Sequence, residues 1–423
     1  MIEHHPVSGL GIGQFRLHLH DTSVLSLLGD TRPEDGDQHQ CEPREADQPD
    51  FDQHGPGARQ NIGAIDPHAP LSACLHVHDP AVWTGLLRGS LGLGETYAQG
   101  AWSSPDLVAL IRLAARNATQ FDALRRRVRL VRAPAQALSS SLPRNTPGRS
   151  RRQIAAHYDL GTDLYRLFLD ETLMYSAAVF EAPDATLHEA QLAKLHRICA
   201  KLQLRPSDHL LEIGTGWGAM AVHAARETGC RVTTTTISAE QHACAVERVR
   251  AAGLEDRITV LQQDYRHLAG TYDKLVSIEM IEAVGWRDFG TYFEACSKLL
   301  APDGLMLLQA ITIDERSYEV EKASKSFINQ LIFPGGCLPS QEAIARSVRR
   351  ETDLRVVQLE DITGHYVRTL RAWRANFLAA ESEVERLGYD LRFRRLWNLY
   401  LAYCEAGFAH GQLGDAQLSL ARV

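Results

Sequence analysis

The chain of 423 residues contains no run of eighteen apolar residues, and its first residues show no basic segment followed by an apolar one. A helix that spans a bilayer needs about 20 mostly apolar residues in a row, and a secretory signal needs the second pattern. The sequence therefore predicts a protein that is made and kept in the cytoplasm.

Paired cysteines are also absent, because none of the eight cysteines forms a C-x-x-C pair. Zinc sites and disulfide frameworks usually show paired or regularly spaced cysteines. Isolated histidines such as His39 and His54 stand in a polar stretch, where a solvated side chain is the ordinary state. We therefore expect no metal and no disulfide framework.

A surplus of positive charge is missing as well, since the net charge is −7. This balance argues against a nucleic-acid partner. The arginines are nevertheless unevenly spread: nine of them, and no acidic residue, lie within residues 124–152. Apolar side chains alternate with these arginines, and such a segment suits an anionic membrane surface. A solvated helix face followed by a loop is the alternative.

Composition divides the chain into four parts. Residues 1–60 include a polar stretch rich in Asp, His, Pro and Gly, and predict a flexible N-terminal tail. Residues 61–135 predict a small N-terminal α+β domain that binds lipid or membrane, with a strand at 71–78, a glycine-punctuated turn at 89–94 and a helix at 104–116. Residues 136–152 form a linker, and residues 153–423 form the main domain.

In the main domain helix patterns and strand patterns alternate, which predicts an α/β fold with a parallel sheet covered on both faces. The expected strands are 210–213, 231–237, 258–262, 272–278, 304–311 and 354–360. The expected helices are 186–201, 219–227, 239–252 and 288–300, with further helices after residue 340. Ligands of such sheets bind at the carboxyl ends of the strands.

The first strand of this domain ends in a glycine-rich turn, E-I-G-T-G-W-G, at residues 212–218. Gly214, Gly216 and Gly218 leave room for a ligand against bare backbone. In the dinucleotide fingerprint G-x-G-x-x-G the third glycine comes one residue later. The spacing therefore favours S-adenosylmethionine over NAD, and a glycine-rich turn without any ligand is the alternative.

Several motifs together resemble the cyclopropane-fatty-acid synthases, which are S-adenosylmethionine-dependent methyltransferases acting on double bonds of phospholipid acyl chains. The resemblance spans about residue 71 to the C-terminal end. Besides the glycine turn, its motifs are H-Y-D-L-G (157–161), M-Y-S (174–176), T-I-S-A-E-Q (236–241), S-I-E-M-I-E-A-V-G (277–285), I-F-P-G-G (332–336) and H-Y-V-R-T-L (365–370). It implies a Rossmann-like class I methyltransferase sheet with helical insertions.

The resemblance also implies S-adenosyl-L-methionine as cofactor and an unsaturated phospholipid as substrate. Thr236 and Gln241 would hold the ribose hydroxyls, Asp264 would accept from the adenine amine, and Tyr265 would pack on the ring. The expected cofactor-binding residues are Tyr175, Ser176, Gly214, Gly216, Gly218, Thr236, Ile237, Gln241, Asp264, Tyr265 and Arg266.

Methyl transfer to an alkene leaves a carbocation, which a nearby carboxylate can stabilise. Glu282 matches the family's catalytic glutamate in the pattern S-x-x-x-x-E, and we interpret its neighbour Glu279 as not catalytic. The other expected catalytic residues are Tyr366, Gln309 and Ile311.

In characterised relatives a bicarbonate ion takes a proton from the new methyl group, and a cysteine, a glutamate, a histidine, a tyrosine and an isoleucine backbone hold it. This chain has Ala177 and Gln309 where the cysteine and the histidine stand, so the anion site is altered. Gln309 and Tyr366 can still donate hydrogen bonds to bicarbonate.

We expect ring closure to a cyclopropane fatty acyl lipid. The alternatives are the same methyl transfer ending in a methylene or methyl-branched product, a catalytically silent lipid-binding homologue, and a small-molecule methyltransferase. We also expect a homodimer that is peripheral at the inner face of the cytoplasmic membrane.

Overall fold

The structure, a computed structural model, describes residues 14–19, 24–27, 71–117, 160–323 and 326–422. The chain divides into two compact units. Unit 1 comprises Met1–Ser139 and Asp390–His410, and unit 2 comprises Ser140–Tyr389 and Gly411–Val423. The expected linker, the arginine-rich stretch and most of the expected tail lie outside the described residues.

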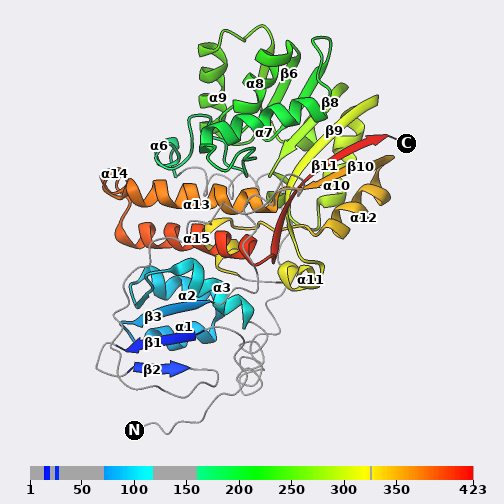
Figure 1. The fold of residues 1–423 in the computed structure, drawn as a ribbon. Helices are drawn as coiled ribbons and strands as arrows, with labels where there is room; N and C mark the ends of the chain where they lie inside the picture. The colour runs from blue at the N-terminus through cyan, green and yellow to red at the C-terminus, as the bar shows by residue number, and fades with distance from the viewer. Residues whose placement is uncertain (1–13, 20–23, 28–70, 118–159, 324–325, 423) are drawn as a thin grey trace, which may run out of the picture. The chain divides into compact units, whose positions relative to one another are not determined.

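Unit 1 contains a four-stranded sheet in the order β2-β1-β3-β4 (Figure 1). Its strands are β1 (Gln14–Leu19), β2 (Val24–Leu27), β3 (Ser72–Val77) and β4 (Trp102–Ser103). The described residues of unit 1 also form the helices α1 (Ala81–Leu87), α2 (Gly89–Ala98), α3 (Leu107–Arg116) and α15 (Leu391–Ala409). The first strand pairs parallel with β3 and antiparallel with β2, so it lies inside the sheet.

The expectation of a flexible tail over residues 1–60 is wrong for residues 14–19 and 24–27, which form β1 and β2. The local sequence gives the reason. Phe15, Leu17 and Leu19 alternate with polar residues, which is the two-residue period of a strand with one apolar side. The polar residues after position 30 dominate the composition of residues 1–60, so composition alone does not reveal this short pattern.

The expected turn at residues 89–94 is also wrong, because these residues begin helix α2. Its glycines serve helix packing. A Cβ atom at Gly92 would lie 2.3 Å from the backbone oxygen of Gly85 in α1, so only glycine permits this approach of the two helices. Glycine in a helix interior is otherwise unfavourable.

Helix α15 belongs to unit 1, which differs from the continuous range 153–423 expected for the main domain. It packs on α2 and α3 and buries Trp397 and Leu401. The guanidinium of Arg395 donates hydrogen bonds of 2.7 Å to the backbone oxygens of Tyr97 and Trp102. These contacts hold a segment that lies late in the sequence on the small N-terminal unit.

Unit 2 contains a seven-stranded sheet in the order β10-β11-β9-β8-β5-β6-β7. Its strands are β5 (His209–Ile213), β6 (Arg231–Thr236), β7 (Ile258–Gln262), β8 (Tyr272–Ile278), β9 (Leu300–Ile313), β10 (Leu354–Asp361) and β11 (Leu413–Arg422). The central strands are parallel, whereas β11 is antiparallel to both of its neighbours. The expected α/β class is confirmed, and every expected strand of this sheet is present.

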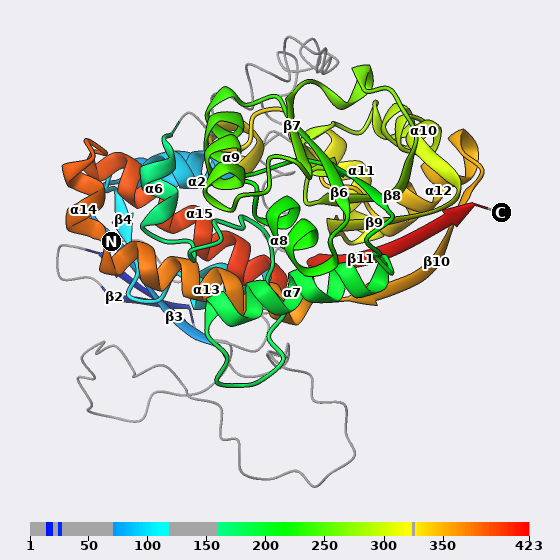
Figure 2. The ribbon, with the colours of Figure 1, turned by 90° about the horizontal axis from the view of Figure 1, so that it is seen from above.

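Helices cover both faces of the sheet (Figures 1 and 2). The helices α7 (Leu187–Lys201), α8 (Ala219–Thr228) and α9 (Ala239–Ala251) pack on one face, and α10 (Phe289–Leu299) and α12 (Gln341–Glu351) pack on the other. Figure 2 shows α10 and α12 beside each other. The other α-helices in the described part of unit 2 are α6 (Thr162–Arg166), α11 (Glu315–Ala323), α13 (Thr363–Ala379) and α14 (Glu381–Arg386).

Candidate active site

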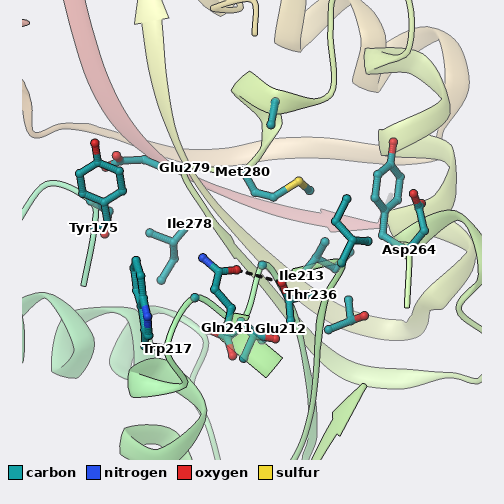
Figure 3. A pocket seen from close by; sticks show the side chains of 18 of the residues that line it. Tyr175, Glu212, Ile213, Trp217, Thr236, Gln241, Asp264, Ile278, Glu279 and Met280 are labelled. Carbon is teal, nitrogen blue, oxygen red and sulfur yellow. Dashed lines mark hydrogen bonds between the residues drawn. The ribbon is translucent and has the colours of Figure 1, made fainter. Parts of the chain in front are cut away.

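A pocket opens at the carboxyl ends of β5, β6 and β8, where a parallel sheet of this kind binds its ligand (Figure 3). In Figure 3, Tyr175 and Glu279 lie at one end of the pocket and Asp264 at the other. The expected residues that line it are Tyr175, Ser176, Gly214, Gly216, Thr236, Ile237, Gln241, Asp264, Tyr265 and Arg266. The structure thus brings together ten of the eleven expected cofactor-binding positions.

The glycine turn after β5 contributes bare backbone to this pocket. Gly214 and Gly216 have positive φ angles of 103° and 51°. A Cβ atom built on Gly216 would meet no protein atom within 4 Å, so open volume faces this backbone.

Gly218 differs from the other two glycines, because it is absent from the pocket lining and lies before the first residue of α8. A Cβ atom there would come within 3.1 Å of the Cβ atom of Ala245 in α9. Its structural part is therefore the close packing of two helices.

Thr236 and Gln241 face each other across the start of α9. The Thr236 hydroxyl donates to Oε1 of Gln241 at 2.9 Å, the bond drawn in Figure 3. Because this bond engages the amide oxygen, the amide NH₂ group of Gln241 is the part that can donate to a ligand hydroxyl. Strand β6 ends with no acidic residue, and this hydroxyl–amide pair lies at its carboxyl end.

Asp264 is less free than expected, because Arg266 binds its carboxylate. The guanidinium donates through Nε at 2.8 Å and through Nη2 at 2.7 Å, and the Arg266 backbone N–H donates at 3.0 Å. Burial alone would raise the pKa of Asp264, but the bonds from Arg266 bring it below its ordinary value. Asp264 is therefore a fixed acceptor, and its link to Arg266 sets its orientation.

Helix α7 holds the backbone around Tyr175 and Ser176. The side chain of Gln191 donates to the backbone oxygen of Ser176 at 3.0 Å, and the Lys194 ammonium donates to its hydroxyl at 2.6 Å. Lys194 is completely buried. Burial lowers its pKa to about 8, although the nearby Glu279 carboxylate opposes this shift.

Glu279 projects from the end of β8 into the same region and lines the pocket. Its Oε1 accepts hydrogen bonds from the Ala177 backbone N–H and from the Gln309 amide, both at 2.7 Å. Its Oε2 accepts from the Tyr366 hydroxyl at 2.8 Å. Two residues expected to hold bicarbonate, Gln309 and Tyr366, therefore hold a carboxylate of the chain itself.

Glu282 occupies a short 3-10 turn, Ile281–Ala283, and lies behind the pocket lining. Its Oε1 accepts from the Ile311 backbone N–H at 2.6 Å. The other oxygen is buried and has no hydrogen-bond partner among the described residues. Burial and the charge of Glu279 raise the pKa of Glu282 to about 8, so this carboxyl is mostly protonated at neutral pH.

A third carboxyl group, Asp415 on β11, completes the cluster. The Gln309 amide donates to its Oδ2 at 3.2 Å. Burial and the neighbouring glutamates raise the pKa of Asp415 well above its ordinary value. Burial also raises the pKa of Glu279, but Lys194 and three hydrogen-bond donors favour its charged form. Among the three carboxyl groups, Glu279 accepts the most hydrogen bonds and has the Lys194 ammonium beside it.

Sequence reasoning missed three members of this cluster: Glu279, Lys194 and Asp415. A signal existed for Lys194, which lies four residues from Ala190 and from Ile198, on the apolar side of its helix. The sequence places Glu279 at the end of an expected strand but does not show its donors, which come from Ala177, Gln309 and Tyr366.

No described helix is both long enough and apolar enough to cross a membrane.

Known proteins resemble this chain in sequence. The family model of mycolic acid cyclopropane synthetases matches residues 146–418. The tuberculostearic acid methyltransferase of Mycobacterium tuberculosis is 38% identical, over 85% of this chain and 85% of the relative. The cyclopropane-fatty-acyl-phospholipid synthase of Escherichia coli is 36% identical, over 82% of this chain and 86% of the relative.

Solved structures resemble it as well. A cyclopropane synthase from Mycobacterium tuberculosis superposes with a TM-score of 0.60 at 31% identity, covering 64% of this chain and 98% of the other. A mycolic acid cyclopropane synthase complexed with SAH, the demethylated product of S-adenosylmethionine, and CTAB gives the same TM-score and identity, covering 64% and 97%.

Proposed function

Because the chain belongs to the mycolic acid cyclopropane synthetase family, we propose that it transfers the methyl group of S-adenosylmethionine to the double bond of an unsaturated phospholipid acyl chain. It is an S-adenosylmethionine-dependent lipid methyltransferase. The acyl double bond as acceptor and the phospholipid as its carrier are the parts that we add.

The observation that supports this proposal is the carboxyl group of Glu279 at one end of the cofactor pocket, beside Lys194 and held by three hydrogen-bond donors. No base has to remove a proton from an alkene before it attacks a methyl donor. The energetic difficulty of the reaction therefore lies in the carbocation that the attack produces. A preorganised negative charge in a site that excludes water stabilises such a cation.

The pocket residues fit the cofactor. S-adenosylmethionine supplies an electrophilic methyl group when it is bound. We assign the methionine part to the bare backbone of Gly214 and Gly216, the ribose to Thr236 and Gln241, and the adenine to Tyr265 beside the fixed Asp264. Tyr175 and Ser176 close the end nearest Glu279.

Bicarbonate fits this site less well than the cofactor does. Gln309 and Tyr366, two of the residues expected to hold it, already donate hydrogen bonds to Glu279. We therefore favour a methylene or methyl-branched product over ring closure. The relative from Mycobacterium tuberculosis, which is named a methyltransferase, supports this choice. Ring closure is the second candidate, supported by the relative from Escherichia coli, which is named a cyclopropane synthase.

The test is the lipid made when the protein is expressed in a host of known unsaturated phospholipids. Both candidate products add one CH₂ unit, so mass alone does not separate them. Mild catalytic hydrogenation does: a methylene group takes up hydrogen and becomes a methyl branch, whereas a cyclopropane is unchanged. Finding no lipid that has gained CH₂ would refute the proposed acceptor.

We also propose that the protein is peripheral at the inner face of the cytoplasmic membrane and works as a homodimer. The arginine-rich residues 124–152 support membrane attraction, with each arginine near an anionic surface contributing on the order of 1 kcal/mol. Binding to anionic vesicles that weakens as salt rises is the expected signature.

A further inference from the structure

We propose that Glu279 is the catalytic base of this reaction, taking a proton from the transferred methyl group. This inference rests on the proposed function. It reverses the interpretation of Glu279 made from the sequence alone. The base is then a side chain of the protein and not a bound ion.

The position of the Glu279 carboxyl group supports this role. Glu279 lines the pocket that the cofactor residues line, and Figure 3 shows it next to Tyr175. The carboxyl group and the residues assigned to the methyl donor therefore line one pocket. Glu282 is not among the residues that line this pocket.

The hydrogen bonds that hold the Glu279 carboxyl group support the same role. Donors converge on it from the segment that follows Ser176, from β9 and from α13, through Ala177, Gln309 and Tyr366. A side chain held from three elements has a fixed geometry, which general-base catalysis requires. The backbone of Glu279 also has a positive φ of 46°, which is rare for a residue with a side chain and recurs at functional sites.

The ionisable groups around Glu279 also support this role. The ionisable groups that face Glu279 are Lys194 on α7, Tyr366 on α13, Asp415 on β11 and Glu282. Lys194 lowers the pKa of Glu279, whereas burial and the neighbouring carboxyl groups raise the pKa of Glu282 and of Asp415. Burial raises the pKa of Glu279, which makes its carboxylate a stronger base than an exposed one.

The reaction begins with methyl transfer and ends with loss of a proton. The π electrons of the alkene form a C–C bond to the methyl carbon while its bond to sulfur breaks, leaving a neutral thioether and a carbocation. Glu279 then takes a proton from the methyl carbon. The C–H electrons form a double bond to that carbon if a hydride shift has moved the positive charge beside it, or a ring bond if it has not.

The first test compares Glu279→Gln with Glu282→Gln, two isosteric changes three residues apart. We expect turnover to fall about 100-fold or more in Glu279→Gln and far less in Glu282→Gln, because Glu282 is already mostly protonated and an amide can still accept from Ile311. Calorimetry should show S-adenosylhomocysteine binding with the wild-type dissociation constant in both. An equal fall in both variants, or a larger one in Glu282→Gln, would overturn the assignment.

The second test is chemical rescue of Glu279→Gly. Glycine accepts the positive φ, and its lack of a side chain leaves the donors of Ala177, Gln309 and Tyr366 facing open space. Added bicarbonate or formate should restore turnover and raise the melting temperature of this variant, while wild type should respond to neither in buffer free of carbon dioxide. A wild type that depends on bicarbonate, or a variant that neither anion stabilises, would refute the inference.

The third test uses S-adenosylmethionine with a fully deuterated methyl group. Proton loss from the transferred methyl group leaves two deuterium atoms in the product, whether it is a methylene or a ring. Retention of all three would show that the proton came from the acyl chain and would contradict the inference. A wild type that methylates no lipid would refute the proposed function itself, so the two failures are distinguishable.

Discussion

Single residues divide the site into two kinds of position. The glycines and the Thr236–Gln241 pair define where a ligand can lie, and each belongs to a short motif of the sequence. The carboxyl groups of Glu279, Glu282 and Asp415 define the electrostatics, and their partners come from distant segments. Local patterns in the sequence could predict the first kind, whereas the second kind exists only in the folded chain.

The clearest residue-scale prediction concerns Gly216. Gly216→Ala should lower the affinity for S-adenosylhomocysteine at least tenfold, because the new methyl group projects into the pocket volume. It should also lose about 1–2 kcal/mol of stability, since φ is positive there. Gly253→Ala is the matched control: Gly253 has a φ of 65°, equally open surroundings and no place in the pocket.

Calorimetric titration and urea unfolding of the two variants measure both effects. The variants should lose similar stability, and only Gly216→Ala should lose affinity. Equal affinity in both variants would mean that the ligand does not lie against Gly216.

Glu212 leads to a prediction about pH. It is buried in β5, accepts from the Thr234 hydroxyl at 2.6 Å, and burial raises its pKa from 4.5 to about 8. The folded protein then binds a proton that the unfolded chain releases, so this contribution to stability is complete below pH 4.5 and is lost as pH rises through about 8.

Glu212→Gln keeps the shape without the ionisation. The free energy of unfolding of the ligand-free variant should therefore gain on wild type as pH rises from about 5 to 8, by on the order of a few kcal/mol. Urea unfolding at several pH values measures it. A constant difference between the two proteins would show that Glu212 does not titrate in this range.

At the scale of elements, the close contact of α1 and α2 shows that the same residue type can have opposite meanings. Glycine repeated at 89, 92 and 94 indicates a turn by composition, but the structure uses Gly92 for the approach of two helix backbones. Gly214 and Gly216, in contrast, lie in a true turn with positive φ.

Gly92→Ala is the corresponding test. In an exposed helix this change would stabilise the protein by roughly 1 kcal/mol. Here the new Cβ atom would lie 2.3 Å from the Gly85 backbone oxygen, so we expect a loss of about 1–3 kcal/mol. Thermal unfolding decides the sign, and a gain in stability would mean that α1 and α2 do not approach so closely.

The strands and helices of unit 2 could be predicted from periodicity because each repeats its apolar pattern over several residues. Strand β11 was missed, although Leu418 and Leu420 alternate with Gln417 and Ser419, a signal that was available. Its burial within the sheet rests on pairing with β9 and β10 across more than fifty residues of sequence. Pairing at that separation has no local signature, and neither has the cluster around Glu279 that depends on it.

At the scale of the whole molecule, the division into two units does not follow the order of the sequence. Residues from both halves of the chain build unit 1, because α15 packs with α2 and α3. The N-terminal residues likewise contribute β1 and β2 to the small sheet.

Two deletions test this arrangement. Removal of residues 1–30 leaves unit 1 with β3 and the two-residue strand β4, and a pair of strands is marginal in water. We expect scanning calorimetry to show a lower melting temperature for this variant. Removal of residues 31–60, whose composition predicts no contribution to a core, should have little effect. Equal melting temperatures in all three proteins would mean that β1 and β2 are dispensable.

The position of β11 in the middle of its sheet has a consequence for biosynthesis. This strand is made after β9 and β10, yet it fills the gap between them and carries Asp415. During synthesis β9 and β10 therefore keep unpaired edges until β11 has left the ribosome, and such edges invite aggregation. The carboxyl cluster can assemble only once β11 is made, so synthesis that stalls before residue 413 would leave an inactive product with exposed strand edges.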